Sequence, residues 1–184
     1  MSSGVREDLS LWKQFLASCT AEKKFKFLFP EEEPKHVIST DASGSIGYGA
    51  VMGDMWFSGK WDDDWWRSQN IALLELYPVY AALHSWITEL SNSTIRVYTD
   101  NMALVSMLNS MYSKDRKINT LLKHCALLIM EHNVVVRAVH IRTEDNTIPD
   151  RLSRDLDCQD VLKAEQKYTL LHIHNPCTIK KLLR

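Results

Sequence analysis

The sequence predicts an α/β domain built on a mixed sheet, antiparallel in its first part and parallel in its later part. Three short β patterns follow one another with only turns between them, and two later β patterns are separated by helical patterns. Strands joined by tight turns pair antiparallel, whereas strands joined through helices pair parallel. Two of the β runs end in Thr-Asp, which places carboxylates at the rim of the sheet. A chain of 184 residues, 45% of them hydrophobic, can build one such domain with a short appendage.

The N-terminal segment predicts an amphipathic helix over residues 6–18, ahead of the main domain. Its apolar side chains recur at helical spacing, and they are Leu9, Leu11, Trp12, Phe15 and Leu16. This apolar face belongs either to a helix packed on the main domain or to the edge of a neighbouring one. We therefore expect a helix and linker over 1–34, the main domain over 35–154 and a tail over 155–184.

The main domain begins with three predicted strands, over about 36–42, 47–52 and 55–61, separated by glycine-containing turns. A loop with three adjacent acids, Asp62 to Asp64, follows them. Neighbouring loop residues rarely converge on one ion, so we expect a solvated acidic turn rather than a metal site.

The rest of the main domain alternates helices with strands. A long helix is expected over 70–90, with Pro78 either kinking it or breaking it after its first turn. The elements expected after it are a strand over 94–99, helices over 101–112 and 117–132, a buried strand over 134–140 and a short helix over 147–153.

Composition narrows the possible functions and the compartment. A net charge of −1 does not suit a protein that binds nucleic acid by charge alone. The four cysteines lie far apart and predict reduced thiols in an intracellular protein, cytoplasmic or nuclear. No apolar run reaches about 18 residues, so we expect no membrane role.

Four acidic residues are the candidate site. Asp41 and Asp100 end two strands, Glu75 lies inside an apolar helix, and Asp150 begins the last helix. On the predicted topology all four can reach one rim of the sheet. Carboxylates that converge without equal numbers of Lys or Arg need a cation among them, and oxygen ligands alone select a hard ion such as Mg²⁺ or Mn²⁺.

These residues resemble motifs of the RNase H domains of retroelement reverse transcriptases, of the DIRS-type and gypsy-like kinds. There the motifs read T-D-A-S, I-N-x-L-E-L, T-D-N and H-I-P-G-x-x-N-x-x-A-D-x-L-S-R. This chain has, in the same order, Thr40-Asp41-Ala42-Ser43, Ile71-Ala72-Leu73-Leu74-Glu75-Leu76, Thr99-Asp100-Asn101, and His140-Ile141 with Asn146, Asp150, Leu152, Ser153 and Arg154. The resemblance covers residues 36–154, and residues 8–16 match an upstream helix of the DIRS-type elements.

The resemblance implies a ribonuclease H-like fold with a mixed five-stranded sheet flanked by helices. It implies an endoribonuclease that hydrolyses the RNA strand of RNA–DNA hybrids with two Mg²⁺ ions, for which Mn²⁺ can substitute. The implied metal ligands are Asp41, Glu75, Asp100 and Asp150. His140 lies where many family members carry a loop histidine that helps to protonate or release the product, although a simple strand-end role stays open.

The resemblance also implies contacts to the hybrid and a polymerase partner. The implied substrate-binding residues are Ser43, Gly44, Asn101 and Asn146, and Asn146 would also hold its loop by hydrogen bonds. In the natural protein a polymerase domain is expected to hold much of the hybrid, which would explain the low positive charge.

Several positions depart from the family pattern. Arg142 and Thr143 replace the Pro-Gly after His-Ile, Pro149 replaces Ala, and Ala72 replaces an Asn that contacts the hybrid. These departures keep a second hypothesis open, a domesticated RNase H-like domain that binds protein or nucleic acid without cleaving it. A third hypothesis, a transposase-like or integrase-like member of the superfamily, fits the order of the acids less well.

Overall fold

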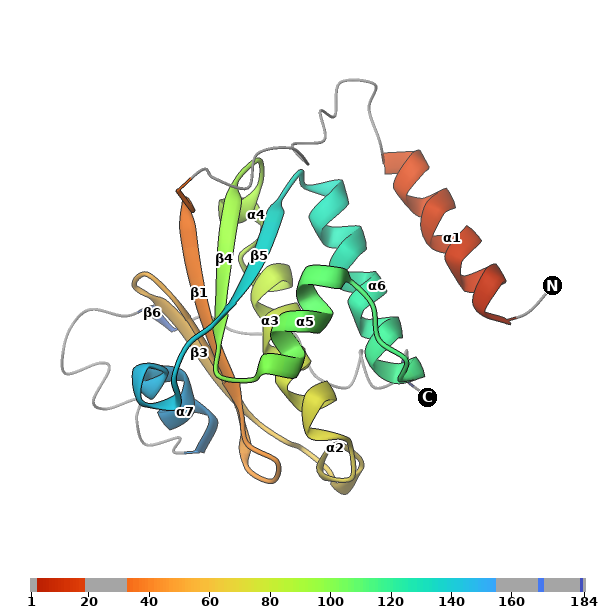
Figure 1. Ribbon diagram of the computed structural model, residues 1–184. Coiled ribbons are helices and arrows are strands. Elements are labelled where there is room, and N and C mark those ends of the chain that lie inside the picture. The colour runs from red at the N-terminus through yellow and green to blue at the C-terminus, as the bar shows by residue number, and fades with distance from the viewer. Residues whose placement is uncertain (1–2, 19–32, 155–168, 171–182, 184) are drawn as a thin grey trace.

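One mixed sheet runs through the protein (Figure 1). The computed structural model describes residues 3–18, 33–154, 169–170 and 183. The strands lie in the order β5-β4-β1-β2-β3-β6, and their bounds are β1 His36–Ala42, β2 Gly47–Met52, β3 Met55–Lys60, β4 Thr94–Thr99, β5 Val135–His140 and β6 Thr169–Leu170. The first five confirm the predicted mixed sheet, close to the predicted bounds.

Strand pairing brings the acidic strand ends to one edge of the sheet. β1, β2 and β3 form an antiparallel meander in which Asp41 lies opposite Gly49. β4 pairs parallel with both β1 and β5, with Ser39 opposite Tyr98 and Thr99 opposite His140. Because β1, β4 and β5 run in the same direction, their C-terminal ends meet at the same edge.

β6 is an addition to the predicted sheet. Its two residues pair parallel with Met55 and Trp56 of β3, in a region for which the sequence predicted only a tail. Two residues carry no periodic pattern, so no sequence signal marks such a strand. Leu183 is also described and is buried in the main core, while the other tail residues lie outside the described part.

Helices cover both faces of the sheet (Figure 1). α3, α5 and α6 lie on one face, where α3 packs on β1 and β2, whereas α7 packs on β1, β2 and β3 from the other. The helix bounds are α1 Ser3–Ser18, α2 Asp64–Arg67, α3 Ile71–Ser85, α4 Ile87–Leu90, α5 Met102–Ser110, α6 Arg116–Glu131 and α7 Thr147–Arg154, with a 3₁₀ turn, η1, over Thr143–Asp145.

A glycine in β2 lets α7 approach the sheet closely. A Cβ atom on Gly49 would lie 2.3 Å from the Cβ of Leu152, closer than two carbon atoms can pack. Leu152 is fully buried and packs with Trp56 of β3. α7 is therefore held against the same stretch of sheet that carries Asp41.

The acidic loop after β3 differs in part from the prediction. Residues 64–67 form one helical turn, α2, and the Asp63 side chain caps it by accepting from the backbone N–H groups of Trp65 and Trp66. Trp66 is buried and stacks on Trp61 with ring centroids 5.2 Å apart. Aromatic packing thus folds this segment into a helical turn instead of a fully solvated loop.

The predicted helix over 70–90 is divided at Trp86 rather than near Pro78. α3 continues through Pro78, and Trp86 separates α3 from α4. Pro78 and Trp86 are both buried. Because tertiary packing stabilises the helix on both sides of the proline, the lost backbone hydrogen bond does not end it.

α1 packs on α6. Phe15 is buried, and Asp8 forms an ion pair of 2.6 Å with Lys123, while Leu9, Trp12 and Leu16 remain exposed. In the described part of the chain, no helix has the length and apolar character needed to cross a bilayer.

Candidate metal centre

Two neighbouring parallel strands place Asp41 and Asp100 together. Asp41 is the penultimate residue of β1, and Asp100 directly follows β4. The Asn101 side chain accepts from the backbone N–H groups of Ala103 and Leu104, so α5 begins immediately after Asp100. This cap ends the strand at a defined residue and holds Asp100 at the rim.

α3 supplies the third carboxylate. Asn70 caps this helix, which packs on β1 and β2, and Glu75 lies in its second turn. The side chain of Glu75 is buried, with 6% of its surface exposed. Asp41, Glu75 and Asp100 each offer a carboxylate oxygen, and these oxygens lie within 4.8 Å of one another.

The protein environment disfavours charge on two of these groups. The pKa of Glu75 is raised from 4.5 to about 9, chiefly by burial and then by the neighbouring Asp41 and Asp100, while hydrogen bonding from the Ala42 backbone and the charge of Arg154 lower it. Burial likewise raises the pKa of Asp41 from 3.8 to about 6, opposed by the hydrogen bond from Ser153. Either protons or a cation must therefore compensate the negative charge at neutral pH.

The donor set fits a divalent cation. Oε2 of Glu75 is buried and has no hydrogen-bond partner among the described residues. An unpaired buried carboxylate oxygen is costly, and an ion coordinated there would satisfy it. The three carboxylates can hold a hard cation because all their ligand atoms are oxygens.

Two hydroxyl groups donate hydrogen bonds to two of these carboxylates. The Ser153 hydroxyl donates to Oδ2 of Asp41 at 2.5 Å, and the Thr143 hydroxyl donates to Oδ2 of Asp100 at 2.8 Å. Ser153 is a residue of the resemblance, and Thr143 is one of its departures, but the sequence indicated no role for either. A serine three residues after Asp150 is the only signal that could have pointed to the first contact.

Asp150 lies apart from the group of three. Its Oδ1 accepts from Nε of Arg154 at 2.6 Å, one helical turn further along α7. It is still close enough that its charge raises the pKa of Asp41, after the larger effects of burial, the Ser153 hydrogen bond and Asp100. The assignment of Asp150 as a metal ligand remains a proposal.

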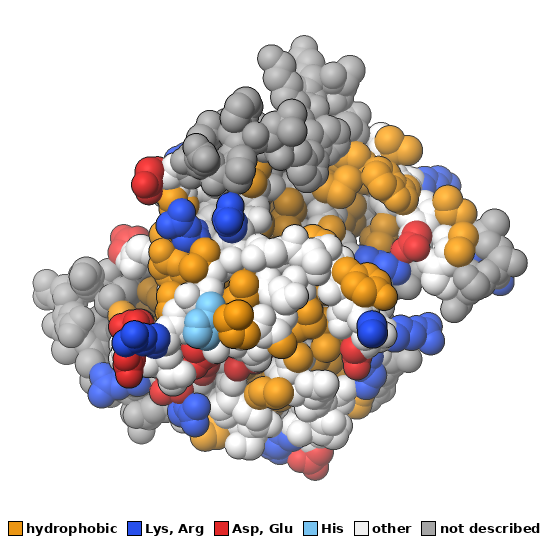
Figure 2. Space-filling model, in the orientation of Figure 1, with side chains coloured by type: hydrophobic (Ala, Val, Ile, Leu, Met, Phe, Trp, Pro, Cys, Tyr) orange, Lys and Arg blue, Asp and Glu red, His pale blue; other side chains and the backbone are white. Residues whose placement is uncertain are grey.

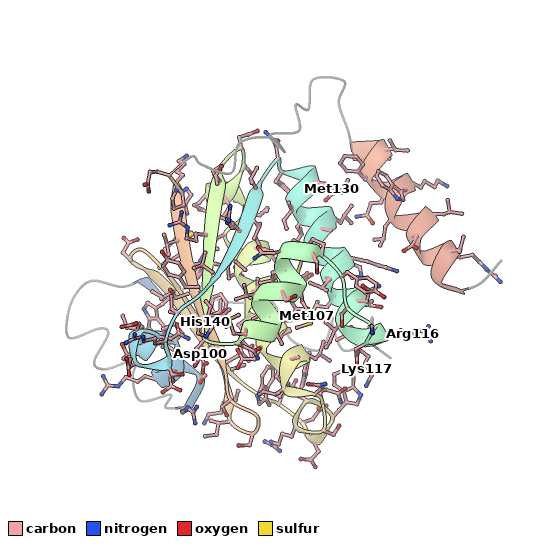
Figure 3. The ribbon with its side chains drawn as sticks, in the orientation of Figure 1. Asp100, Met107, Arg116, Lys117, Met130 and His140 are labelled. Atoms are coloured by element: carbon pink, nitrogen blue, oxygen red, sulfur yellow. The ribbon has the colours of Figure 1, made fainter. Side chains whose placement is uncertain are left out.

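His140 ends β5 beside Asp100, and Figure 3 shows the two residues together at the rim. Nε2 of His140 lies 3.1 Å from the backbone carbonyl oxygen of Asp100, to which it donates when it carries a proton. The imidazole is exposed to solvent.

Three of the four predicted substrate-binding residues also make hydrogen bonds within the fold. The Ser43 hydroxyl accepts from the backbone N–H groups of Ser45 and Ile46, and Gly44 is exposed in the same turn. Asn101 caps α5. Asn146 is 1% exposed and donates to the backbone carbonyl of Thr40, which ties its loop to β1, as the loop-holding role requires. Contacts of these four residues to a substrate remain predictions.

Comparisons with known proteins give the fold. Neither protein-family models nor curated proteins match the sequence. The structure is similar to LC11-RNase H1, solved in complex with an RNA/DNA hybrid, at 22% identity and a TM-score of 0.55, over 64% of this chain and 93% of that one. It is also similar to the N-terminal RNase H domain of a Mycobacterium tuberculosis protein, at 19% identity and a TM-score of 0.49 over 73% of this chain and 99% of that one. The similarity to LC11-RNase H1 shows that the protein has the ribonuclease H-like fold.

Proposed function

We propose that this protein is an RNase H-type endonuclease that hydrolyses the RNA strand of RNA–DNA hybrids with divalent cations, Mg²⁺ in particular. The observation that carries this proposal is the convergence of Asp41, Glu75 and Asp100, whose oxygens lie within 4.8 Å of one another. The likeness to LC11-RNase H1 shows the fold alone; the hybrid as substrate rests on the motif resemblance of residues 36–154.

The carboxylates, the hydroxyl groups and the imidazole of the site would have different roles in this reaction. Asp41, Glu75 and Asp100 would hold the cation, and Ser153 and Thr143 would keep two of these carboxylates oriented. Two Mg²⁺ ions held by these carboxylates would supply an activated water and would stabilise the leaving oxygen of a displacement at phosphorus. We propose Asp150 as the fourth ligand, and His140 as the group that protonates or releases the product.

Substitution of the acids tests this function. Asp41→Asn and Asp100→Asn are expected to abolish cleavage of a labelled RNA–DNA hybrid and to keep a cooperative thermal unfolding transition. Asp54→Asn is the matched control, because Asp54 is exposed in the turn between β2 and β3. Full activity in the Asp41 and Asp100 variants would refute the site.

A second function, binding without cleavage, is favoured by one observation. Asp150 is engaged by Arg154 and lies outside the group of three carboxylates. If the protein binds without cleaving, the wild-type protein would bind the hybrid equally in Mg²⁺ and in EDTA, and the RNA strand would stay intact in both. Gel electrophoresis of the same samples separates the two functions.

We further propose that the protein is the RNase H part of a retroelement polymerase of the DIRS-type or gypsy-like kind. The motif order supports this origin, and so does the match of residues 8–16 to an upstream helix. Joining this chain to a polymerase domain of such an element should raise its affinity for the hybrid, and an unchanged affinity would count against this origin.

A further inference from the structure

Arg154 places a positive charge beside the acidic group. Its Nε donates to Oδ1 of Asp150 at 2.6 Å, four residues away on α7. Asp150 makes no other side-chain hydrogen bond that the described part of the chain shows. In the protein without a cation, the guanidinium is thus the charged partner of this carboxylate.

The same guanidinium acts on the other acids. Burial raises the pKa of both Glu75 and Asp41, and the charge of Arg154 lowers both. Hydrogen bonding to Asp150, followed by the charges of Asp150, Asp41 and Asp100, raises the pKa of Arg154 itself. Arg154 therefore compensates part of the negative charge that a divalent cation would otherwise compensate.

The fold of α7 does not depend on the ion pair between Arg154 and Asp150. Its side chain is 61% exposed, so the ion pair is open to solvent and weak. α7 is held by other contacts, namely Leu152 against Gly49 and Ser153 on Asp41. The Asp150 side chain is 32% exposed, so both partners can turn towards solvent.

We propose that Arg154 is a positioning residue that holds Asp150 in the cation-free protein and competes with divalent cations for that carboxylate. The inference rests on the proposed function, because it concerns cations at the same group of acids. Its consequence is that removing the guanidinium strengthens cation binding, the opposite of what loss of a structural contact would do.

The test is titration of Mn²⁺ into the whole chain without hybrid, with free Mn²⁺ measured by electron paramagnetic resonance. Arg154→Gln should bind Mn²⁺ about fivefold more tightly than wild type, the size expected for loss of one exposed charge pair. Arg151→Gln is the control, because it removes the same charge from an exposed position of α7. It should change the affinity far less.

The outcomes separate this inference from the function on which it rests. If Arg154→Gln binds no more tightly than Arg151→Gln, or more weakly than wild type, the competition is refuted while the metal site stands. If neither wild type nor any variant binds Mn²⁺, both proposals fail. If only Arg154→Gln binds Mn²⁺, competition by Arg154 is supported.

A second measurement follows Arg154 directly. In a ¹⁵N-labelled sample, the Nε–H resonance of Arg154 should shift during Mg²⁺ titration towards its position in the Asp150→Asn variant. The Arg151 resonance serves as the internal reference. An Arg154 resonance that stays in place at saturating Mg²⁺ would show that the ion pair persists and would refute the competition.

Discussion

Glu75 shows how a single residue can indicate an ion. The fold buries its carboxylate beside Asp41 and Asp100, and it leaves Oε2 without a hydrogen-bond partner among the described residues. A buried acid without a partner takes up a proton unless a positive charge is near. At neutral pH the cation-free site therefore holds a proton that a metal ion would replace.

This burial predicts how stability depends on pH. The pKa of Glu75 is raised from 4.5 to about 9, so the folded protein binds the proton more tightly than the unfolded chain. Stability is therefore greatest below pH 4.5 for this group, and it falls as the pH rises towards 9. The raised pKa of Asp41 likewise lowers the stability of the folded protein as the pH rises from 3.8 to about 6.

In EDTA, the melting temperature of the wild-type protein should fall between about pH 5 and about pH 9. Glu75→Gln should weaken this dependence and raise the melting temperature at the alkaline end, because the glutamine does not ionise. Mg²⁺ should restore part of the loss in wild type only. A steeper fall in Glu75→Gln than in wild type would contradict the account.

Thr143 offers a test of the hydroxyl contacts. Thr143→Val removes the donor to Oδ2 of Asp100 with little change of shape, whereas Thr143→Ser keeps it. We expect Thr143→Val to weaken Mn²⁺ binding by about tenfold, the loss typical of groups that orient a metal ligand. Thr143→Ser should restore the affinity. Because Thr143 is exposed, the free energy of unfolding should change by less than about 0.5 kcal/mol.

At the scale of elements, the position of α7 decides whether the site is complete. α7 carries Asp150, Ser153 and Arg154, and it rests on β2 where Gly49 leaves room for Leu152. The site therefore depends on a glycine that carries no functional group and lies opposite Asp41 in the sheet.

Gly49→Ala should displace α7. The new methyl group would overlap Leu152, and overpacking of this kind costs about 1–3 kcal/mol in the free energy of unfolding, which urea denaturation measures. Gly4→Ala is the control, because nothing lies within 4 Å of the added atom and alanine favours the helix. Equal stability of Gly49→Ala and wild type would show that α7 does not depend on this close contact.

Element types followed from the sequence, but several boundaries did not. Apolar β runs separated by glycine-containing turns predicted β1 to β3, and Thr-Asp marked the end of β4. At α2 and at the division at Trp86, aromatic rings pack on residues that are distant in the sequence, Trp66 on Tyr77 and Trp86 on Phe57. Such packing is a tertiary effect that local patterns do not carry.

At the scale of the whole molecule, charge is the limiting property for hybrid binding. The face shown in Figure 2 has basic and acidic side chains scattered over it rather than one continuous basic surface. Together with a net charge of −1, this predicts few phosphate contacts by the isolated chain.

Hybrid binding should therefore depend only weakly on salt. For the Asp41→Asn variant, raising NaCl from about 50 to about 200 mM should weaken binding by no more than about tenfold, the change expected for about two phosphate contacts. Fluorescence anisotropy with a labelled hybrid measures this. A loss of about a thousandfold would reveal a basic surface that the charge distribution does not predict.

The sequence predicted the acids of the site better than it predicted their partners. Asp41, Glu75 and Asp100 lie together because strand direction and helix crossover follow general rules. Ser153, Thr143 and Arg154 act through distances of 2.5–2.8 Å, which depend on side-chain conformation. No spacing rule specifies such contacts, so their roles appear only in three dimensions.

The most direct test of the central claim is cleavage of a 5′-labelled RNA paired with DNA, by the wild-type chain, as Mg²⁺ is added to a metal-free sample. The account predicts no cleavage in EDTA, and cleavage within the RNA strand, leaving 3′-hydroxyl ends, once Mg²⁺ is present. Intact RNA at every Mg²⁺ concentration, from a folded protein that binds the hybrid, would contradict it.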